Sequence, residues 1–108
     1  MSETNNLNSV LIEGILVEDA VEKRGEFQDE VVAFILSSKR LLRHGDGSLE
    51  KQVNFFRVFV RGNVLRKACM EKAKKGCGVR VIGFLVGGRP SAIYIEAEHV
   101  EFRSEAQE

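Results

Sequence analysis

Hydrophobic and polar residues alternate over several short stretches of this chain, a pattern typical of half-buried strands. These stretches are rich in Val, Ile and Phe, which favour strands. The pattern predicts five strands, over residues 9–17, 30–38, 51–61, 79–86 and 92–102. No internal repeat or low-complexity linker interrupts them, so the chain is expected to form one domain.

A different period appears only between the third and fourth strands. Residues 64–75 carry an apolar stripe at helical spacing, which predicts the only helix, with its N-cap at Asn63 and its C-terminal stop at Gly76. Two other connections are polar. Residues 18–28 are expected to form a turn or a frayed continuation of the first strand, and residues 39–49, which contain a Gly-Asp-Gly sequence, a flexible loop.

The order of elements is strand, strand, strand, helix, strand, strand. This order predicts an all-β protein of the OB-fold class, a five-stranded Greek-key barrel with one helix between the third and fourth strands. Gly14 and Gly83 fall inside strands, which suits the strong coiling of a closed barrel. We expect the barrel to span residues 8–103, between a flexible N-terminus (1–7) and a frayed C-terminus (104–108).

The pattern of the third predicted strand, residues 51–61, indicates a function as well as a fold. Side chains alternate between the two faces of a strand, so one face carries only apolar groups and is expected to fill the core. The other face carries Phe55, Arg57, Phe59 and Arg61. Aromatic rings stack on unpaired bases and cations hold phosphates, which is how single strands are bound without sequence readout. The alternative is that the two rings pack against a partner subunit or a loop.

The charge of the chain is zero overall but strongly segregated. Residues 1–30 carry eight acidic and two basic side chains, residues 31–94 three acidic and thirteen basic, and residues 95–108 five acidic and one basic. Local positive clusters, rather than net charge, attract polyanions. The basic middle of the chain therefore favours a nucleic-acid partner over chance clustering on a solvated surface.

Further cations are candidate phosphate contacts. Lys39, Arg40 and Arg43 lie in the expected loop between the second and third strands, and such loops flank the binding cleft of OB-folds. An ordinary solvated loop is the alternative. Lys74 and Lys75 are placed in the last turn of the expected helix, where they either contact phosphate or only complement the helix dipole.

For three residues in the last quarter of the chain, the sequence allows more than one role. Arg89 lies in a short turn and is a candidate phosphate contact. Phe84 shares a strand face with apolar neighbours, and either stacks a base or is covered in an oligomer interface. Tyr94 is amphipathic, and a place in the core, in an interface or against a ligand fits it.

Other classes of function lack support in the sequence. No nucleophile–base spacing, paired carboxylates, metal motif or phosphate-binding glycine loop is present, so we expect no catalytic residue, no metal, no cofactor and no small-molecule substrate. Cys69 and Cys77 match neither a redox pair nor a zinc motif and are expected to be reduced thiols. No apolar run is long enough to span a membrane, and the polar N-terminus has no signal core, so a cytoplasmic location is expected.

Five segments together resemble the bacterial single-stranded DNA-binding protein family. The segment LNSVLIEGIL resembles the family's N-K-V-x-L-x-G-x-L opening, and AKKGCGVRVIGFL its L-x-K-G-x-x-V-x-V-x-G-x-L segment. The segments, in family order and at nearly the family spacing, are residues 7–16, 32–36, 56–62, 73–85 and 95–102.

The resemblance implies a non-enzymatic, nucleoid-associated protein that coats single-stranded DNA in replication, repair and recombination, as a homotetramer. Some members of the family stack bases on tryptophan, but this chain has none. By the resemblance, Leu41 and Phe55 occupy two positions where family members carry a stacking tryptophan. Arg61 occupies a position where they often carry phenylalanine. Two alternatives stay open: a primosomal OB-fold protein, typically dimeric, that helps load the replicative helicase, and an OB-fold that binds only proteins.

Overall fold

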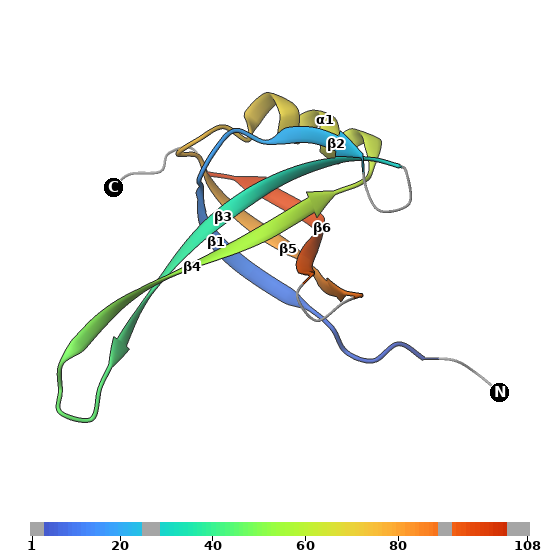
Figure 1. The fold of residues 1–108 in the computed structure, drawn as a ribbon. Helices are drawn as coiled ribbons and strands as arrows, with labels where there is room; N and C mark the ends of the chain where they lie inside the picture. Colours follow the sequence, from blue (N-terminus) through green and yellow to red (C-terminus); the bar gives the residue numbers. More distant parts are fainter. Residues whose placement is uncertain (1–3, 25–28, 89–91, 104–108) are drawn as a thin grey trace.

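The computed structural model describes residues 4–24, 29–88 and 92–103, which form six strands and one helix (Figure 1). In chain order these are β1 (Val10–Leu16), β2 (Val21–Arg24), β3 (Glu30–Arg43), β4 (Leu49–Val60), α1 (Asn63–Lys72), β5 (Gly78–Gly87) and β6 (Ile93–Phe102). No helix within these residues is long and apolar enough to cross a membrane. The expected domain limits stay a prediction, and residues 1–3 and 104–108 lie outside the described residues.

Five of the strands close into a barrel, which confirms the predicted OB-fold. The strands follow the order β1-β5-β6-β4-β3, and β1 also pairs with β3, which closes the ring. Among the described strands, β4 and β6 pair in parallel and all other pairs are antiparallel. β2 lies outside the ring and pairs with β3 alone among the described strands. Figure 1 shows α1 at one end of this barrel and the tip of the β3–β4 hairpin projecting far from it.

The two glycines inside strands are required by close approach of neighbouring backbones. A Cβ atom on Gly14 would lie 2.2 Å from the carbonyl oxygen of Ser37, and one on Gly83 would lie 2.0 Å from that of Glu96. At Gly83 the register between β5 and β6 also shifts, as in a β-bulge. The mid-strand glycines therefore mark the closure of the barrel and its bulge, in agreement with the coiling expected from the sequence.

Alternation along the strands fills the barrel with apolar side chains. In β4 the face carrying Val58 and Val60 is fully buried, and Phe56 packs against the same core. In β5 the inward residues are Val79 and Val81. The helix packs against the core through Cys69, whose side chain is fully buried. Burial raises the pKa of the Cys69 thiol to about 11.

The helix is shorter than the sequence pattern predicts. It begins at Asn63 and ends at Lys72, and its N-cap is Gly62, without a side-chain cap, so the expected cap at Asn63 is wrong. The chain leaves the helix at the buried Ala73, whose carbonyl accepts a hydrogen bond from the backbone of Ala20 (2.9 Å). This tertiary contact stops the helix before Gly76, where φ is +87°.

The expected loop over residues 39–49 is mostly strand. β3 continues to Arg43 and β4 starts at Leu49, so only residues 44–48 connect them. Asp46 accepts hydrogen bonds from the backbone N–H and hydroxyl of Ser48, and Gly47 has a φ of +91°. The glycine-rich signal therefore marks a tight hairpin turn and not a flexible loop.

The segment expected to be a turn, residues 18–28, contains a strand that the pattern did not predict. Val21–Arg24 pairs with β3, and all four side chains are exposed. A short strand with no buried face carries no apolar alternation, so its sequence gives no strand signal.

Candidate nucleic-acid interface

The exposed face of β4 carries the ring-and-cation alternation that the sequence predicts. The side chain of Phe55 is 64% exposed, Arg57 is exposed, and Phe59 is half-buried. Residues directly opposite one another in an antiparallel pair share a face. Ser37 and Ile35 of β3 therefore lie beside Phe55 and Arg57 on this face.

The same face continues along the projecting hairpin. Register places Lys39 opposite Val53, Leu41 opposite Lys51, and Arg43 opposite Leu49. We call the whole band the outer stripe: Phe59, Arg57, Phe55, Val53, Lys51 and Leu49 of β4, with Ile35, Ser37, Lys39, Leu41 and Arg43 of β3. At about 3.3 Å per residue it runs for roughly 33 Å, from the barrel to the hairpin tip.

The cations of the outer stripe are available to an anionic ligand. Within the described part of the chain, no carboxylate forms a salt bridge with Lys39, Lys51 or Arg57. The guanidinium of Arg57 makes only a long hydrogen bond, 3.5 Å, to the carbonyl of Ile93. Their charges are therefore compensated mainly by solvent, the condition under which counterions are released when phosphate binds.

At the barrel end of the outer stripe, Phe59 is in contact with an aromatic ring from another strand. Tyr94 of β6 stacks on Phe59, with ring centroids 4.4 Å apart and planes inclined by 23°. The ammonium of Lys23, on β2, lies over the Phe59 ring at 5.7 Å from its centroid. Two aromatic groups and one cation from three different strands are thus gathered at one place.

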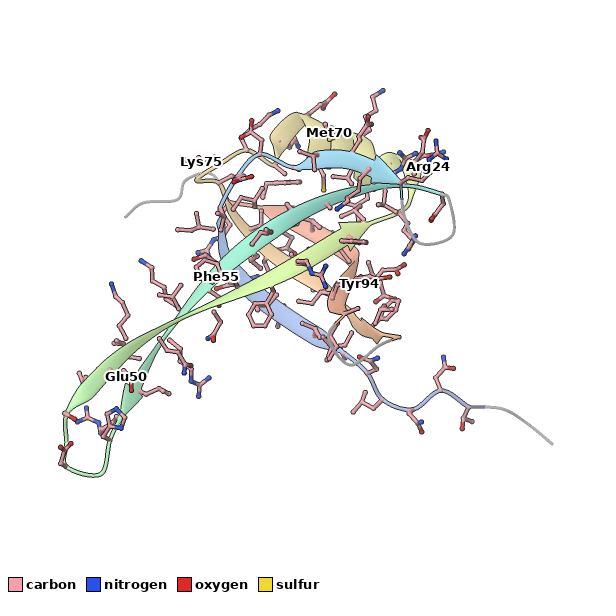
Figure 2. The ribbon with its side chains drawn as sticks, in the orientation of Figure 1. Arg24, Glu50, Phe55, Met70, Lys75 and Tyr94 are labelled. Atoms are coloured by element: carbon pink, nitrogen blue, oxygen red, sulfur yellow. The ribbon has the colours of Figure 1, made fainter. Side chains whose placement is uncertain are left out.

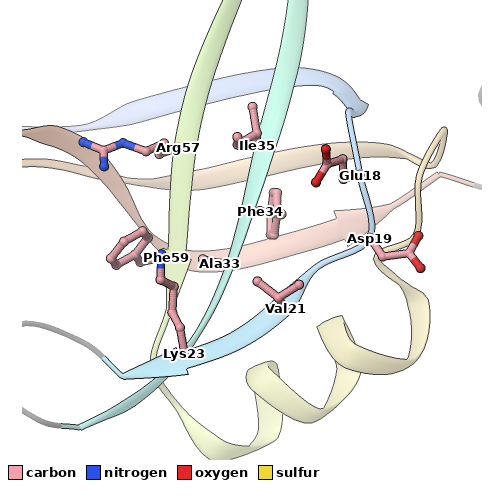
Figure 3. A pocket seen from close by; sticks show the side chains of 9 residues that line it. All are labelled: Glu18, Asp19, Val21, Lys23, Ala33, Phe34, Ile35, Arg57 and Phe59. Carbon is pink, nitrogen blue, oxygen red and sulfur yellow. The ribbon is translucent and has the colours of Figure 1, made fainter.

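A groove of about 150 Å³ opens beside Phe59 and is lined by residues of the neighbouring strands β2, β3 and β4 (Figure 3). Its floor is apolar and includes Ala33, Phe34 and Ile35. Lys23 and Arg57 supply positive charge to its wall, and the connection between β1 and β2 supplies two carboxylates. An apolar floor with a few polar groups at its edges is typical of a ligand site.

Arg61, the fourth residue of the predicted motif, lies in a different environment. Its guanidinium donates hydrogen bonds to Asp29, to Glu96 (Nε to Oε1, 3.0 Å) and to the hydroxyl of Tyr94 (Nη2 to Oη, 3.1 Å). Its side chain is only 24% exposed. Burial alone would lower the pKa of Arg61, but the hydrogen bonds to Glu96, Asp29 and Tyr94 outweigh it and raise this pKa. Arg61 therefore already has two anionic partners.

The other cations predicted to contact phosphate lie apart from one another. Lys39 and Arg43 lie on the outer stripe, whereas Arg40, opposite Gln52, points by alternation to the other face of the hairpin. The sequence suggested a loop at these three residues, but all three belong to β3. Lys74 and Lys75 are exposed but follow the helix, so their placement in its last turn is wrong. They lie on the connection to β5.

Phe84 lies two strands away from Phe59. It is half-buried and pairs with Glu96 of β6, which in turn is in register with Phe59 of β4. The carboxylate of Glu96 thus separates Phe84 from the outer stripe. Arg89 lies outside the described residues.

Several residues of this surface were not assigned to it from the sequence. Lys51, Val53 and Leu49 extend the β4 alternation toward the turn, and following the period of two back to residue 49 would have found them. Lys23 and Tyr94 reach Phe59 only through tertiary structure, and no local signal indicates this.

The opposite wall of the barrel carries charges that neutralise one another. Arg80 of β5 forms salt bridges with Glu13 of β1 and Glu101 of β6, and Arg103 also reaches Glu13 (3.4 Å). The hydrogen bond and charge of Arg80 lower the pKa of the Glu13 carboxyl. Among the described residues no cluster of three or more His, Cys, Asp or Glu could hold a metal ion. Within the described part of the chain, the arginines of this wall are thus paired with carboxylates, in contrast to the cations of the outer stripe.

Comparison with known proteins gives one family and one fold. The family model described as "Single-strand binding protein family" matches residues 7–100. No curated protein matches the chain significantly.

Three solved structures share the fold at low sequence identity. The SSB of Plasmodium falciparum in complex with ssDNA has a TM-score of 0.79 at 18% identity, over 95% of this chain and 100% of that one. A small single-stranded DNA-binding protein from Streptomyces coelicolor has a TM-score of 0.73 at 18% identity (93% and 97%). A deletion mutant of the Thermus aquaticus single-stranded DNA binding protein has a TM-score of 0.75 at 16% identity, over 91% of this chain but 51% of that one.

Proposed function

Because the chain belongs to the single-strand binding protein family, we propose that it binds single-stranded DNA along the outer stripe without reading base sequence. The observation that carries this proposal is the alternation of aromatic and cationic side chains on one continuous face, from Phe59 to Arg43, with the exposed ring of Phe55 among them. Stacking on aromatic side chains contributes about 1–3 kcal/mol per base and does not depend on which base is present. Family membership also agrees with a binding protein that is not an enzyme.

The cations of the outer stripe must supply a large part of the affinity. Phe55 is the only strongly exposed aromatic ring among the described residues, so stacking alone is limited to few bases. Each phosphate held by Lys or Arg releases a counterion, which adds affinity at low salt. Lys39, Lys51 and Arg57 are the residues we expect to act in this way.

The wider role follows the family. We propose that the protein coats unwound DNA in replication, repair and recombination, in the cytoplasm on the nucleoid. A homotetramer is the assembly that the family resemblance implies. Leu11 (68% exposed) and Leu85 (47% exposed) lie on β1 and β5, away from the hairpin, and a subunit interface would cover such apolar side chains. Light scattering distinguishes this tetramer from the dimer typical of primosomal OB-fold proteins.

The experiment is a fluorescence anisotropy titration of labelled oligo-dT at several salt concentrations. We expect high affinity at low salt and a steep linear fall of log K with log salt, with a slope of about −0.7 for each phosphate contact. Phe55→Ala should weaken binding about 5- to 150-fold, which corresponds to one lost stack. Val64→Ala is the matched control, because Val64 is 86% exposed on α1. No anisotropy change at micromolar protein would instead indicate an OB-fold that binds only proteins.

A further inference from the structure

The stacked pair of Phe59 and Tyr94 separates two hollows on the surface of the barrel. Phe59 lines the groove formed by residues of β2, β3 and β4. Tyr94 (labelled in Figure 2) lines a second hollow of about 390 Å³, together with Arg61, Glu96 and residues 86–88. Phe59 covers one face of the Tyr94 ring and does not itself line this second hollow. The hollow is far larger than the 10–15 Å³ or so that one water molecule needs, so it has volume for a group larger than water.

Phe59 itself is poorly placed to stack a base. Its ring is in contact with Tyr94 on one side, and the ammonium of Lys23 lies over the ring as well. A base could reach the Phe59 ring only by displacing one of these neighbours. Tyr94 is therefore the member of the pair that borders an open hollow, and the one that we expect to offer a ring face to a base.

The orientation of Tyr94 is fixed by Arg61. The hydroxyl of Tyr94 accepts a hydrogen bond from Arg61, and the other nitrogens of that guanidinium are held by Glu96 and Asp29. A planar guanidinium bound at several points by charged partners has little freedom to rotate. The ring of Tyr94 is thus held in place before any ligand arrives, which lowers the entropic cost of binding.

On this basis, and resting on the proposed function, we propose that Tyr94 stacks a nucleobase of the bound single strand, and that Arg61 is a positioning residue for Tyr94 and not a phosphate contact. Asp29 and Glu96 line the same hollow, and carboxylates repel phosphate. The base, not the backbone, therefore enters the hollow, while the phosphates follow Arg57 and the lysines of the outer stripe.

The chain offers a direct test, because it contains one tyrosine and no tryptophan. Its intrinsic emission therefore reports on Tyr94 alone. Titration with unlabelled oligo-dT, corrected for absorption by the DNA, should quench this emission and saturate at the same DNA concentration as the anisotropy signal. Saturating anisotropy with unchanged tyrosine emission would overturn the role of Tyr94 and leave the proposed function standing. Absence of any anisotropy change would remove both.

Variants separate positioning from phosphate contact. Tyr94→Leu should weaken oligo-dT binding about 5- to 150-fold, and Tyr94→Phe, which keeps the ring, should weaken it less. The charge-neutral double variant Arg61→Met with Glu96→Gln should also weaken binding but leave the salt slope unchanged. Arg57→Ala serves as the comparison, since losing one phosphate contact should reduce the slope by about 0.7.

Two results would refute this assignment. A folded Tyr94→Leu protein, verified by circular dichroism, that binds with the affinity of the wild type would exclude stacking on Tyr94. A salt slope that falls in the Arg61 double variant as it does in Arg57→Ala would make Arg61 a phosphate contact.

Discussion

Closure of the barrel depends on the missing side chain at Gly14, so Gly14→Ala should destabilise the protein. Gly14 lies where β1 passes from β5 to β3, because the next residue, Ile15, is in register with both Gly78 and Ser37. A Cβ atom here would lie 2.2 Å from the Ser37 carbonyl oxygen and 2.9 Å from its carbon. The two backbones would have to separate by at least about 0.8 Å to reach the 3.0 Å limit of real Cβ contacts.

The magnitude follows from three terms. Overpacking against atoms that cannot rotate away costs about 1–3 kcal/mol. Separation of β1 from β3 also weakens the hydrogen bond from the Val17 N–H to the Ile35 carbonyl (3.0 Å), which contributes about 1 kcal/mol. Alanine restricts the unfolded chain and offsets about 0.4–1 kcal/mol of this loss. The net loss is about 1–3.6 kcal/mol, or a fall in Tm of roughly 5–25 °C for a domain of this size.

Urea and thermal unfolding followed by circular dichroism, at one fixed protein concentration, measure this effect. Gly45→Ala is the matched control, because no atom lies within 4 Å of its Cβ position and its φ is not positive. This control should be unchanged or more stable by about 0.4–1 kcal/mol. If Gly14→Ala proved as stable as Gly45→Ala, the close contact between β1 and β3 would be wrong.

Three other expectations concern charge and thiol chemistry. Arg57→Ala should weaken binding to oligonucleotides of every composition about equally, as measured by anisotropy; a loss confined to one base would contradict a phosphate contact. In thiol labelling of the native protein, half-buried Cys77 should react well before Cys69, whose burial raises its pKa to about 11, and both should react in urea; early modification of Cys69 would contradict its burial. Because Arg80 lowers the pKa of Glu13 from its usual 4.5, this pair stabilises the fold above about pH 4.5 and loses that effect as the pH falls through the lowered value. Arg80→Met should therefore make urea stability less dependent on pH in the acid range, and an unchanged acid dependence would count against the pair.

The sequence predicts the barrel well where a strand has one buried face. In β4 the period of two separates Val58 and Val60 from Phe55 and Arg57, because burial on one side alone imposes that period. The same reasoning fails for β2 and for residues 39–43 of β3, where most side chains are exposed. There the strands are held by backbone pairing, and no apolar alternation marks them.

The candidate site shows the same limit at the level of single residues. Arg57 and Arg61 occupy equivalent positions in the alternation, yet only Arg61 is enclosed by carboxylates. Asp29 and Glu96, its partners, are 32 and 35 residues away in the chain. Local pattern therefore identifies which face a cation lies on, but not whether tertiary structure has already neutralised it.

Acidic and basic residues are segregated along the chain, and the fold keeps some of them on different sides of the barrel, although the chain has no net charge. Acidic residues from both ends of the barrel sequence, Glu13 and Glu101, are paired with Arg80 on one wall. The basic middle of the chain instead supplies Lys39 and Lys51, which project on a hairpin away from that wall and have no carboxylate partner among the described residues. A polyanion approaching the hairpin meets uncompensated positive charge at distances shorter than the Debye length of about 8–10 Å, whereas charges on the far wall are screened. Binding should therefore depend steeply on salt even though the protein is electrically neutral as a whole.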